Sequence, residues 1–251
     1  MKILVTFAVP TEFAPWRRQR GFRQISTVPF PLYAAEIGAS TVRVLLTGVG
    51  TAAAARAMRF ALVSPADLCI SSGFVGALRS DVKVGEILAA RLVRRAEKDL
   101  AVASDPDLLA TACEARARPV DRFLTAERLI LTAEGKSALV DEADAVEMES
   151  FMILAEAARH GTRAVAVRVV SDTAKTSLPY DFDRALDANG RIRLGALIAG
   201  VVRRPQRIPA LLRLGRDCRL AAQDLAGFLD QYLNLLNSRL DLSQSEMVAA
   251  T

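Results

Sequence analysis

The chain has 251 residues, 51% of them hydrophobic, which is enough to bury a sizeable core and favours one large α/β domain. Its formal net charge is +5 at pH 7, but acidic and basic residues are mixed along the whole chain. Proteins dedicated to nucleic-acid binding usually concentrate their basic residues in a stripe, so we expect no nucleic-acid partner.

The cysteine usage and the apolar segments indicate a cellular compartment. Cys69, Cys113 and Cys218 are odd in number and far apart, which is typical of reduced thiols in a cytosolic protein. No metal-ligand spacing is present in the sequence, so we expect no metal. The N-terminal run "MKILVTFAV" is too short for a secretory signal, and no stretch reaches the roughly 18 apolar residues of a membrane span. We therefore expect a cytoplasmic protein.

Short apolar runs rich in Val, Ile and Leu alternate with helical patterns over the first 175 residues. Runs without polar alternation are typical of strands that are covered on both faces. The sequence therefore predicts a three-layer αβα fold with a mostly parallel, mixed central sheet. The expected strands are 3–9, 42–47, 67–71, 86–93 and 164–170, and the expected helices are 51–63, one from 106 onward, and 150–160.

The sequence changes character after Pro179. "YDFDRALDANGRIRLG" is typical of loop and turn, 194–203 of a helix, and 209–240 of a long amphipathic helix with candidate breaks at Gly215 and Gly227. No internal repeat or low-complexity linker precedes this tail. We predict a single domain over 1–251, in which 180–251 form a mainly helical extension that covers the sheet or an oligomer face.

Ligands of open α/β sheets bind beyond the carboxyl ends of the strands, so the residues that follow the apolar runs are candidates for a site. Asp172 follows one run in "VVSDTA", where partial burial would let its carboxyl hold a proton and act as a general acid. A helix-capping or turn aspartate explains the same hexapeptide. Glu12 follows the first run and is unremarkable by itself.

The stretch "AVEMESF" places Glu147 and Glu149 around Met148, directly before an expected helix. A helix cap at Glu149 and a core methionine explain only one of the two acids. A carboxylate that binds sugar hydroxyls, beside a soft apolar side chain against the sugar face, explains all three residues. It would also stabilise the positive charge that develops on a ribosyl ring when its bond to a base breaks.

Two glycine-containing segments are also candidates for ligand contact. "TGVGTAAAARA" matches the dinucleotide-binding pattern G-x-G-x-x-A, but no acid follows the next expected strand, so a tight strand-to-helix turn is the alternative. In "SSGFVGALRSDVKVGE", Gly73 and Gly76 would let the backbone approach a ligand, and a plain glycine-rich loop before a hairpin is an equal alternative. The side chains there that could bind an anion are Ser71, Ser72 and Arg79.

In this order, the segments resemble the nucleoside phosphorylase/nucleosidase superfamily, which includes purine nucleoside phosphorylase, uridine phosphorylase and methylthioadenosine/S-adenosylhomocysteine nucleosidase. The similarity covers most of residues 1–175 and rests on the early Glu12, "TGVGTAAAA", "GFVGAL" followed by "VGE", "AVEMES" and "RVVSDTA". The resemblance implies an enzyme with the fold of that family. Its substrate would be a purine nucleoside, and it would need no cofactor besides water or phosphate as co-substrate.

The resemblance also implies a role for each matching residue. Asp172 would protonate the departing purine at N7, Glu149 would bind the ribose hydroxyls, and Met148 would lie against the sugar. Glu12 would orient or deprotonate an attacking water, with Glu147 as support.

Further substrate contacts follow from the same resemblance. The contacts to the base edge fall at Leu129 and Ile130, although the usual Ser-Gly-Asp of the family reads Thr-Ala-Glu at 125–127. The remaining contacts fall at Gly73, Phe74 and Ser171. A phosphorylase needs arginines to bind phosphate. The candidate arginines lie in no motif that matches the family, so hydrolysis is favoured; the candidates are Arg17, Arg18, Arg43 and Arg79.

The tail segments "SDTAKTSLP", "NGRIRLGAL" and "RRPQRIPALLRLGRDCRLAA" resemble the branch of the superfamily that releases adenine from adenosylhopane in hopanoid biosynthesis. This resemblance implies a large apolar 5′ group on the ribose, a homodimer or larger homo-oligomer, and peripheral membrane contact. The alternatives are a phosphate-dependent purine nucleoside phosphorylase, an NAD-binding oxidoreductase that uses the Gly48 turn, and a family member that binds nucleosides or lipids without turnover.

Overall fold

The computed structural model describes residues 1–96, 100–179, 187, 190 and 205–249. In this part of the chain, an 11-stranded sheet has the order β2-β3-β4-β1-β5-β11-β6-β10-β9-β7-β8, and β11 also pairs with β7. The strands are β1 (Lys2–Phe7), β2 (Arg23–Ser26), β3 (Leu32–Ile37), β4 (Ser40–Leu46), β5 (Leu68–Ser71), β6 (Phe74–Ala77), β7 (Ile87–Arg95), β8 (Leu100–Ala103), β9 (Arg118–Thr125), β10 (Ala145–Glu147) and β11 (Arg163–Asp172). The helices are α1 (Pro10–Arg20), α2 (Thr51–Ala61), α3 (Pro106–Glu114), α4 (Ala133–Ser137), α5 (Ser150–Arg159), the 3₁₀ turn η2 (Pro205–Arg207) and α7 (Ile208–Ala249).

The sheet is mixed, with parallel pairing at its centre. β4, β1, β5, β11 and β6 are parallel neighbours, whereas β2 and β3 at one edge and β8 at the other pair antiparallel. The central strands are apolar and buried along nearly their whole length, as expected for strands that are covered on both faces. The predicted three-layer mixed α/β fold is therefore confirmed.

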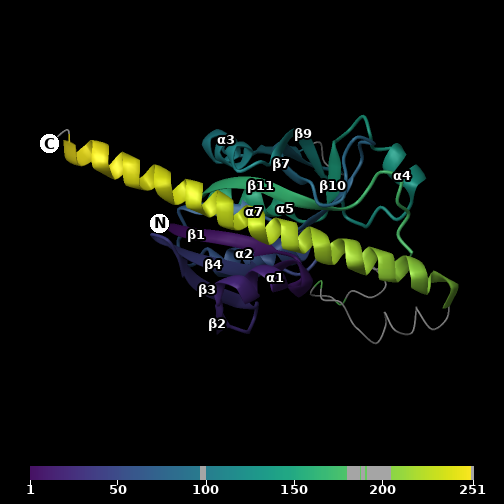
Figure 1. The fold of residues 1–251 in the computed structure, drawn as a ribbon, viewed down its shortest axis with the longest axis horizontal. Helices are drawn as coiled ribbons and strands as arrows, with labels where there is room; N and C mark the ends of the chain where they lie inside the picture. The colour runs from purple at the N-terminus through teal and green to yellow at the C-terminus, as the bar shows by residue number, and fades with distance from the viewer. Residues whose placement is uncertain (97–99, 180–186, 188–189, 191–204, 250–251) are drawn as a thin grey trace.

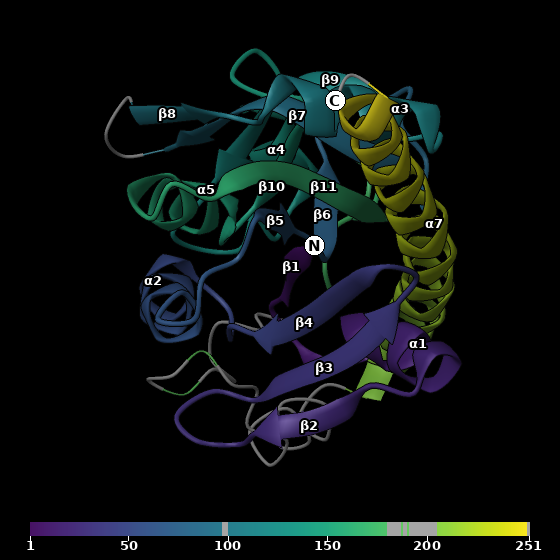
Figure 2. The same cartoon turned by 90° about the vertical axis from the view of Figure 1, so that its left-hand side faces the viewer.

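Helices cover both faces of the sheet, and each face has its own core (Figure 2). α1, α3 and α7 lie on one face, where Phe13, Trp16 and Leu225 belong to one buried cluster. α2 and α5 lie on the other face, where Met58 and Leu154 belong to a second cluster. Alternating crossovers to the two faces of a parallel sheet produce this arrangement.

The expected elements of the first 175 residues are present, with ends that differ by one or two residues. The sequence pattern does not predict six of the described strands, namely β2, β3, β6, β8, β9 and β10. β2 and β8 are mostly exposed edge strands, and β10 has only three residues, so none of these three carries a long apolar run. Short or exposed strands give a weak periodic signal.

The predicted breaks at Gly215 and Gly227 are wrong, because α7 runs through both glycines without interruption. Figure 1 shows this helix along the whole length of the molecule. Each glycine costs about 1 kcal/mol relative to alanine, and the buried contacts of α7 with β11 and α1 offset that cost. Trp16 and Arg20 of α1 also bond to Asp230 of α7, at 2.7 and 2.8 Å. The organisation of the chain as one domain stays a prediction.

Two further points concern the expectations for the tail and the membrane. The loop predicted for "YDFDRALDANGRIRLG" and the helix predicted for 194–203 lie largely outside the described residues. Within the described ranges, no helix combines the length and the apolar character that crossing a bilayer requires.

Candidate active site

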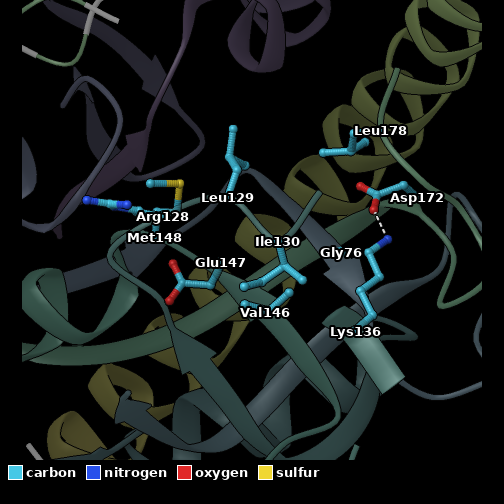
Figure 3. A pocket seen from close by; sticks show the side chains of 10 residues that line it. All are labelled: Gly76, Arg128, Leu129, Ile130, Lys136, Val146, Glu147, Met148, Asp172 and Leu178. Carbon is cyan, nitrogen blue, oxygen red and sulfur yellow. Dashed lines mark hydrogen bonds and ion pairs between the residues drawn. The ribbon is translucent and has the colours of Figure 1, made fainter. Parts of the chain in front are cut away.

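A pocket opens beside the carboxyl ends of β10 and β11 (Figure 3). In the view of Figure 3, Asp172 and Lys136 lie at one end of the pocket and Glu147 and Met148 at the other, with Ile130 between them. The fold thus brings together five residues that the sequence analysis selects from separate motifs. The complete lining is Gly76, Arg128, Leu129, Ile130, Lys136, Val146, Glu147, Met148, Asp172 and Leu178.

Asp172 is the last residue of β11 and is buried, with 7% of its surface exposed. The Ser171 hydroxyl donates to its Oδ1 at 2.7 Å, and the Lys136 ammonium contacts its Oδ2. A Cβ at Gly76 would lie 3.1 Å from Asp172 Oδ2, so glycine there gives the carboxylate room. Because its contacts are with side chains at a strand end, the alternative of a simple helix cap is wrong.

Lys136 is a residue that sequence reasoning does not single out. It belongs to the short helix α4 and is only 1% exposed. Its Nζ also donates to the carbonyl of Thr173 at 2.8 Å. The Thr132 side chain caps α4 by accepting from the Gly135 amide, which holds the lysine in place.

Arg168 organises the acids near the pocket. It lies in β11, is 1% exposed, and forms ion pairs with Glu147 at 2.9 Å and Glu149 at 3.1 Å. Its Nε donates to the Ser150 hydroxyl at 3.0 Å, and its Nη1 donates to the carbonyl of Phe74 at 3.1 Å. Burying a charge is costly unless it is paired; the two ion pairs provide that pairing, although Nη2 contacts Glu147 without forming a hydrogen bond among the described residues.

Glu147, rather than Glu149, caps helix α5. Its Oε2 accepts from the backbone amides of Glu149 and Ser150, at 2.8 and 2.6 Å. The Thr125 hydroxyl donates to its other oxygen and accepts from the Phe151 amide at 3.0 Å. Glu149 occupies the N-cap position but makes no cap bond with its side chain, so the predicted cap at Glu149 is wrong.

Glu149 is tied to the glycine turn before α2. Its Oε1 accepts from the Gly50 amide at 2.9 Å. Burial raises the pKa of Glu149 to about 7; the charge of Arg168 opposes this rise and the carboxylate of Glu147 adds to it. Gly48 and Gly50 have positive φ values of 78° and 95°, which confirms a tight strand-to-helix turn. The Gly50 amide, which a dinucleotide would need, already binds Glu149.

Glu12 is buried, although the sequence alone leaves it an ordinary surface acid. Its Oε2 accepts from the amides of Ala8 and Val9, at 2.8 and 2.9 Å, and its Oε1 accepts from the Phe74 amide at 2.7 Å. Burial raises the pKa of Glu12, and the charge of Arg168 and these three amides oppose the rise. A Cβ at Gly73 would lie 2.7 Å from Glu12 Oε1, so Gly73 is required for this contact.

The three side chains that were candidates for anion binding do not act together. The Ser71 hydroxyl bonds to Ser150, and within the described residues the buried Ser72 hydroxyl, next to Gly73, has no hydrogen-bond partner. Arg79 is half exposed and pairs with the carboxylates of Asp81 and Asp144. It therefore does not form the predicted anion-binding site with Ser71 and Ser72.

Three of the four arginines considered for phosphate, namely Arg17, Arg43 and Arg79, have partners other than the residues that line the pocket. Arg43 donates to three backbone carbonyls near the end of α2, and the guanidinium of Arg17 lies 4.6 Å from the centre of the Tyr33 ring. Arg168, which the sequence analysis misses, is the arginine that lies among the site acids. Its signal was available, since a lone arginine inside the apolar run "AVAVRVVSD" must find acidic partners when the strand is buried.

The described residues contain no cluster of three or more His, Cys, Asp and Glu side chains that could hold a metal ion. The three cysteines are free; Cys69 is buried, and Cys113 and Cys218 are partly buried.

Comparison with known proteins agrees with this geometry. A model of the family described as the phosphorylase superfamily matches residues 2–203. No curated protein matches the chain.

Several solved structures have the same fold. The 5′-methylthioadenosine/S-adenosylhomocysteine nucleosidase of Neisseria meningitidis, in complex with methylthio-immucillin-A, is 20% identical with a TM-score of 0.72, over 92% of this chain and 98% of that chain. The corresponding nucleosidase of Campylobacter jejuni is 16% identical with a TM-score of 0.72, over 93% and 98%. Futalosine hydrolase of Helicobacter pylori is 17% identical with a TM-score of 0.70, over 93% and 97%. Since the family model covers most of its length, the chain belongs to the phosphorylase superfamily and is an enzyme of the nucleosidase or phosphorylase type.

Proposed function

We propose that this enzyme hydrolyses the N-ribosidic bond of a purine nucleoside and releases the free base. The observation that carries the proposal is the pocket, which has an acid at one end and a glutamate beside a methionine at the other. The purine lies along Leu129 and Ile130 with its N7 edge toward Asp172. The ribose lies on Met148, with its hydroxyls toward Glu147 and Glu149.

This arrangement suits the charge that develops during the reaction. As the C1′–N9 bond breaks, the ribosyl ring becomes positive and the departing purine becomes negative. The carboxylates of Glu147 and Glu149 stabilise the positive ring, and a proton delivered at N7 neutralises the purine. Arg168 pairs with both glutamates and keeps them in position.

Glu12 is the residue that activates water in this proposal. An ionised carboxylate has about four acceptor positions, and three backbone amides use three of them. The remaining position accepts a proton from a water molecule beside Gly73, where the unpaired hydroxyl of Ser72, among the described residues, is a second polar contact. Water is favoured over phosphate because Arg17, Arg43 and Arg79 are engaged elsewhere.

The substrate in this proposal is an adenine nucleoside with an apolar 5′ group, and adenosylhopane is the specific candidate. α7 packs against β11 and β6, the strands that carry Asp172 and Gly76. The first half of this helix exposes large apolar side chains at Ile208 and Leu212. Those side chains would cover an apolar chain leaving the pocket, at a membrane surface if the substrate is a lipid.

The same proposal includes a homodimer or larger homo-oligomer in the cytoplasm, without a cofactor or nucleic-acid partner. The solved structures with this fold that are named above include nucleosidases, which supports the hydrolytic branch of the proposal. Sedimentation velocity at micromolar protein measures the oligomeric state, and a monomer at that concentration contradicts this part of the proposal.

Base release from a small panel tests the proposed reaction. The panel contains adenosine, methylthioadenosine, inosine, uridine and an adenosine with a long apolar 5′ chain, each with and without phosphate. We expect adenine release without phosphate, fastest for the long 5′ chain. Release only with phosphate would make the enzyme a phosphorylase, and no release from any purine nucleoside would refute the reaction.

Replacement of the acid at the base end tests the assignment of residues. Asp172→Asn keeps the shape of the side chain but has no proton to give, so we expect base release to fall 10²- to 10⁴-fold with an unchanged circular dichroism spectrum. A variant that retains activity would assign the protonation of the base to another group.

A further inference from the structure

The buried lysine beside Asp172 changes how a proton reaches the base. Lys136 and Asp172 form an ion pair in which the lysine side chain is 1% exposed and the aspartate side chain 9% exposed. Figure 3 shows the lysine extending from α4 to the carboxylate at one end of the pocket. In an ion pair the transferable proton lies on the cation, so a proton that leaves through Asp172 has its source in the Lys136 ammonium.

Lys136 is held in this position by contacts across two segments. The Leu178 amide donates to the carbonyl of Leu131 at 2.7 Å, and the Ala133 amide donates to the Ser177 hydroxyl at 3.1 Å. These bonds join the segment before α4 to the segment that follows β11. The pairing of Lys136 with Asp172 is therefore built into the fold on both sides.

We propose that Lys136 supplies the proton that Asp172 delivers to N7 of the departing base. This inference rests on the proposed base release. The ammonium of Lys136 carries the transferable proton in the resting enzyme, and Asp172 relays it. Lys136 acts through Asp172, so it is a positioning and proton-supplying residue rather than a contact to the base.

The step balances without any additional reactant. The C1′–N9 bond breaks and its electron pair stays with the purine, which takes a proton at N7 from Asp172. That proton comes to Asp172 from Lys136 in the same step, so Asp172 ends as the carboxylate it was at the start, and Lys136 becomes a neutral amine that then takes a proton from solvent. The water forms the new C1′–O bond and loses its proton to Glu12, which returns it to solvent.

Other ionisable groups face this pair from the neighbouring elements. Glu147 at the end of β10 and the guanidinium of Arg128 line the same pocket, and Cys218 of α7 is within electrostatic range of Asp172. Glu147 and Arg128 have opposite charges, and burial raises the pKa of Cys218 so that its thiol stays neutral. Lys136 is thus the cation in direct contact with Asp172 among the described residues that line the pocket.

Two substitutions separate proton supply from charge. Lys136→Arg retains a positive charge that can pair with Asp172, but an arginine does not give up its proton. Lys136→Met removes the charge and leaves a lone buried carboxyl, which takes up a proton from solvent at low pH. Lys83→Met is the control, because Lys83 is exposed.

The test measures kcat for base release at pH 5 and pH 8 with the best substrate of the wild-type enzyme. We expect Lys136→Arg to lose at least 100-fold at both pH values. We expect kcat of Lys136→Met to be at least 100-fold below that of wild type at pH 8. The ratio of variant kcat to wild-type kcat should be at least tenfold higher at pH 5 than at pH 8. The Lys83→Met variant should stay within twofold of wild type at both.

Each other outcome overturns the inference. Activity of Lys136→Arg within threefold of wild type at pH 8 would mean that a fixed charge suffices. A Lys136→Met deficit that is equal at both pH values would mean that the lysine is only structural. Thermal unfolding identifies a variant that does not fold, in which case Lys136→Arg carries the test alone. Failure of the proposed function is a separate result, because wild-type enzyme would then release no base.

Discussion

Glu149→Gln should make the protein more stable at neutral pH while it abolishes sugar recognition. Glutamine keeps the shape of Glu149 and the acceptor for the Gly50 amide, but it removes a buried negative charge beside Glu147. Burial raises the pKa of Glu149 from 4.5 to about 7, in spite of the opposing charge of Arg168. Ionisation of this carboxyl is therefore less favourable in the folded protein than in the unfolded chain, and the folded protein carries the carboxylate above about pH 7.

The size of the effect follows from this difference in pKa. The folded protein binds the Glu149 proton more tightly than the unfolded chain, so the free energy of unfolding falls as pH rises from about 4.5 to about 7. At about 1.4 kcal/mol for each pKa unit, the ionised carboxyl costs roughly 3 kcal/mol above pH 7. Between pH 5 and pH 8 this contribution changes by about 2–3 kcal/mol.

Urea unfolding of both proteins at pH 5 and pH 8 checks this expectation. The variant should gain about 2–3 kcal/mol relative to wild type between pH 5 and pH 8, with unchanged dependence on urea concentration. Base release should fall at least 100-fold, because the group that we propose to bind the ribose hydroxyls loses its charge. A stability difference that is the same at both pH values would refute the reasoning about Glu149.

Two further substitutions test the packing behind the pocket. Gly73→Ala should destabilise the fold by about 1–3 kcal/mol and lower base release, because its Cβ would lie 2.7 Å from Glu12 Oε1 at a φ of 128°. Gly21→Ala is the matched control, because Gly21 has a positive φ but its added Cβ would meet no atom within 4 Å. An equal loss of stability in both variants would contradict the importance of the contact between Gly73 and Glu12. Arg168→Met should cost about 3–5 kcal/mol in urea unfolding, because two buried carboxylates lose their cation. Arg91→Met, at an exposed ion pair with Asp121, should cost less than about 1 kcal/mol, and a similar cost for both arginines would be inconsistent with this account.

The central strands and the principal helices could be predicted from the sequence because their signals are local. β5 has four consecutive buried residues, and β11 is buried along nine of its ten positions, so both appear as apolar runs. The edge strand β2 is largely exposed, and the three residues of β10 precede a helix directly, so neither has a distinct pattern. Gly215 and Gly227 gave a misleading signal, since the packing of α7 outweighs their low helix propensity.

The candidate site also contains residues that the sequence predicts and residues that it does not. The order of the motifs was enough to select Asp172, Glu147, Met148, Leu129 and Ile130, which line one pocket in the structure. The side chains that set the charge of these acids could not be selected in the same way. "TAEGKSA" is an ordinary polar stretch until the fold places its lysine against a carboxylate 36 residues away.

The sequence by itself determined the layers of the fold, the family resemblance and the acids available for catalysis, because strand and helix periodicity and motif order are properties of neighbouring residues. Only the tertiary structure decided which partner each acid takes and which acid caps a helix. Glu147 takes the cap, Glu149 the glycine turn and Asp172 the lysine, and each choice depends on groups that are distant in sequence. Burial makes these pairings decisive, since an unpaired charge is far more costly inside the protein than in water.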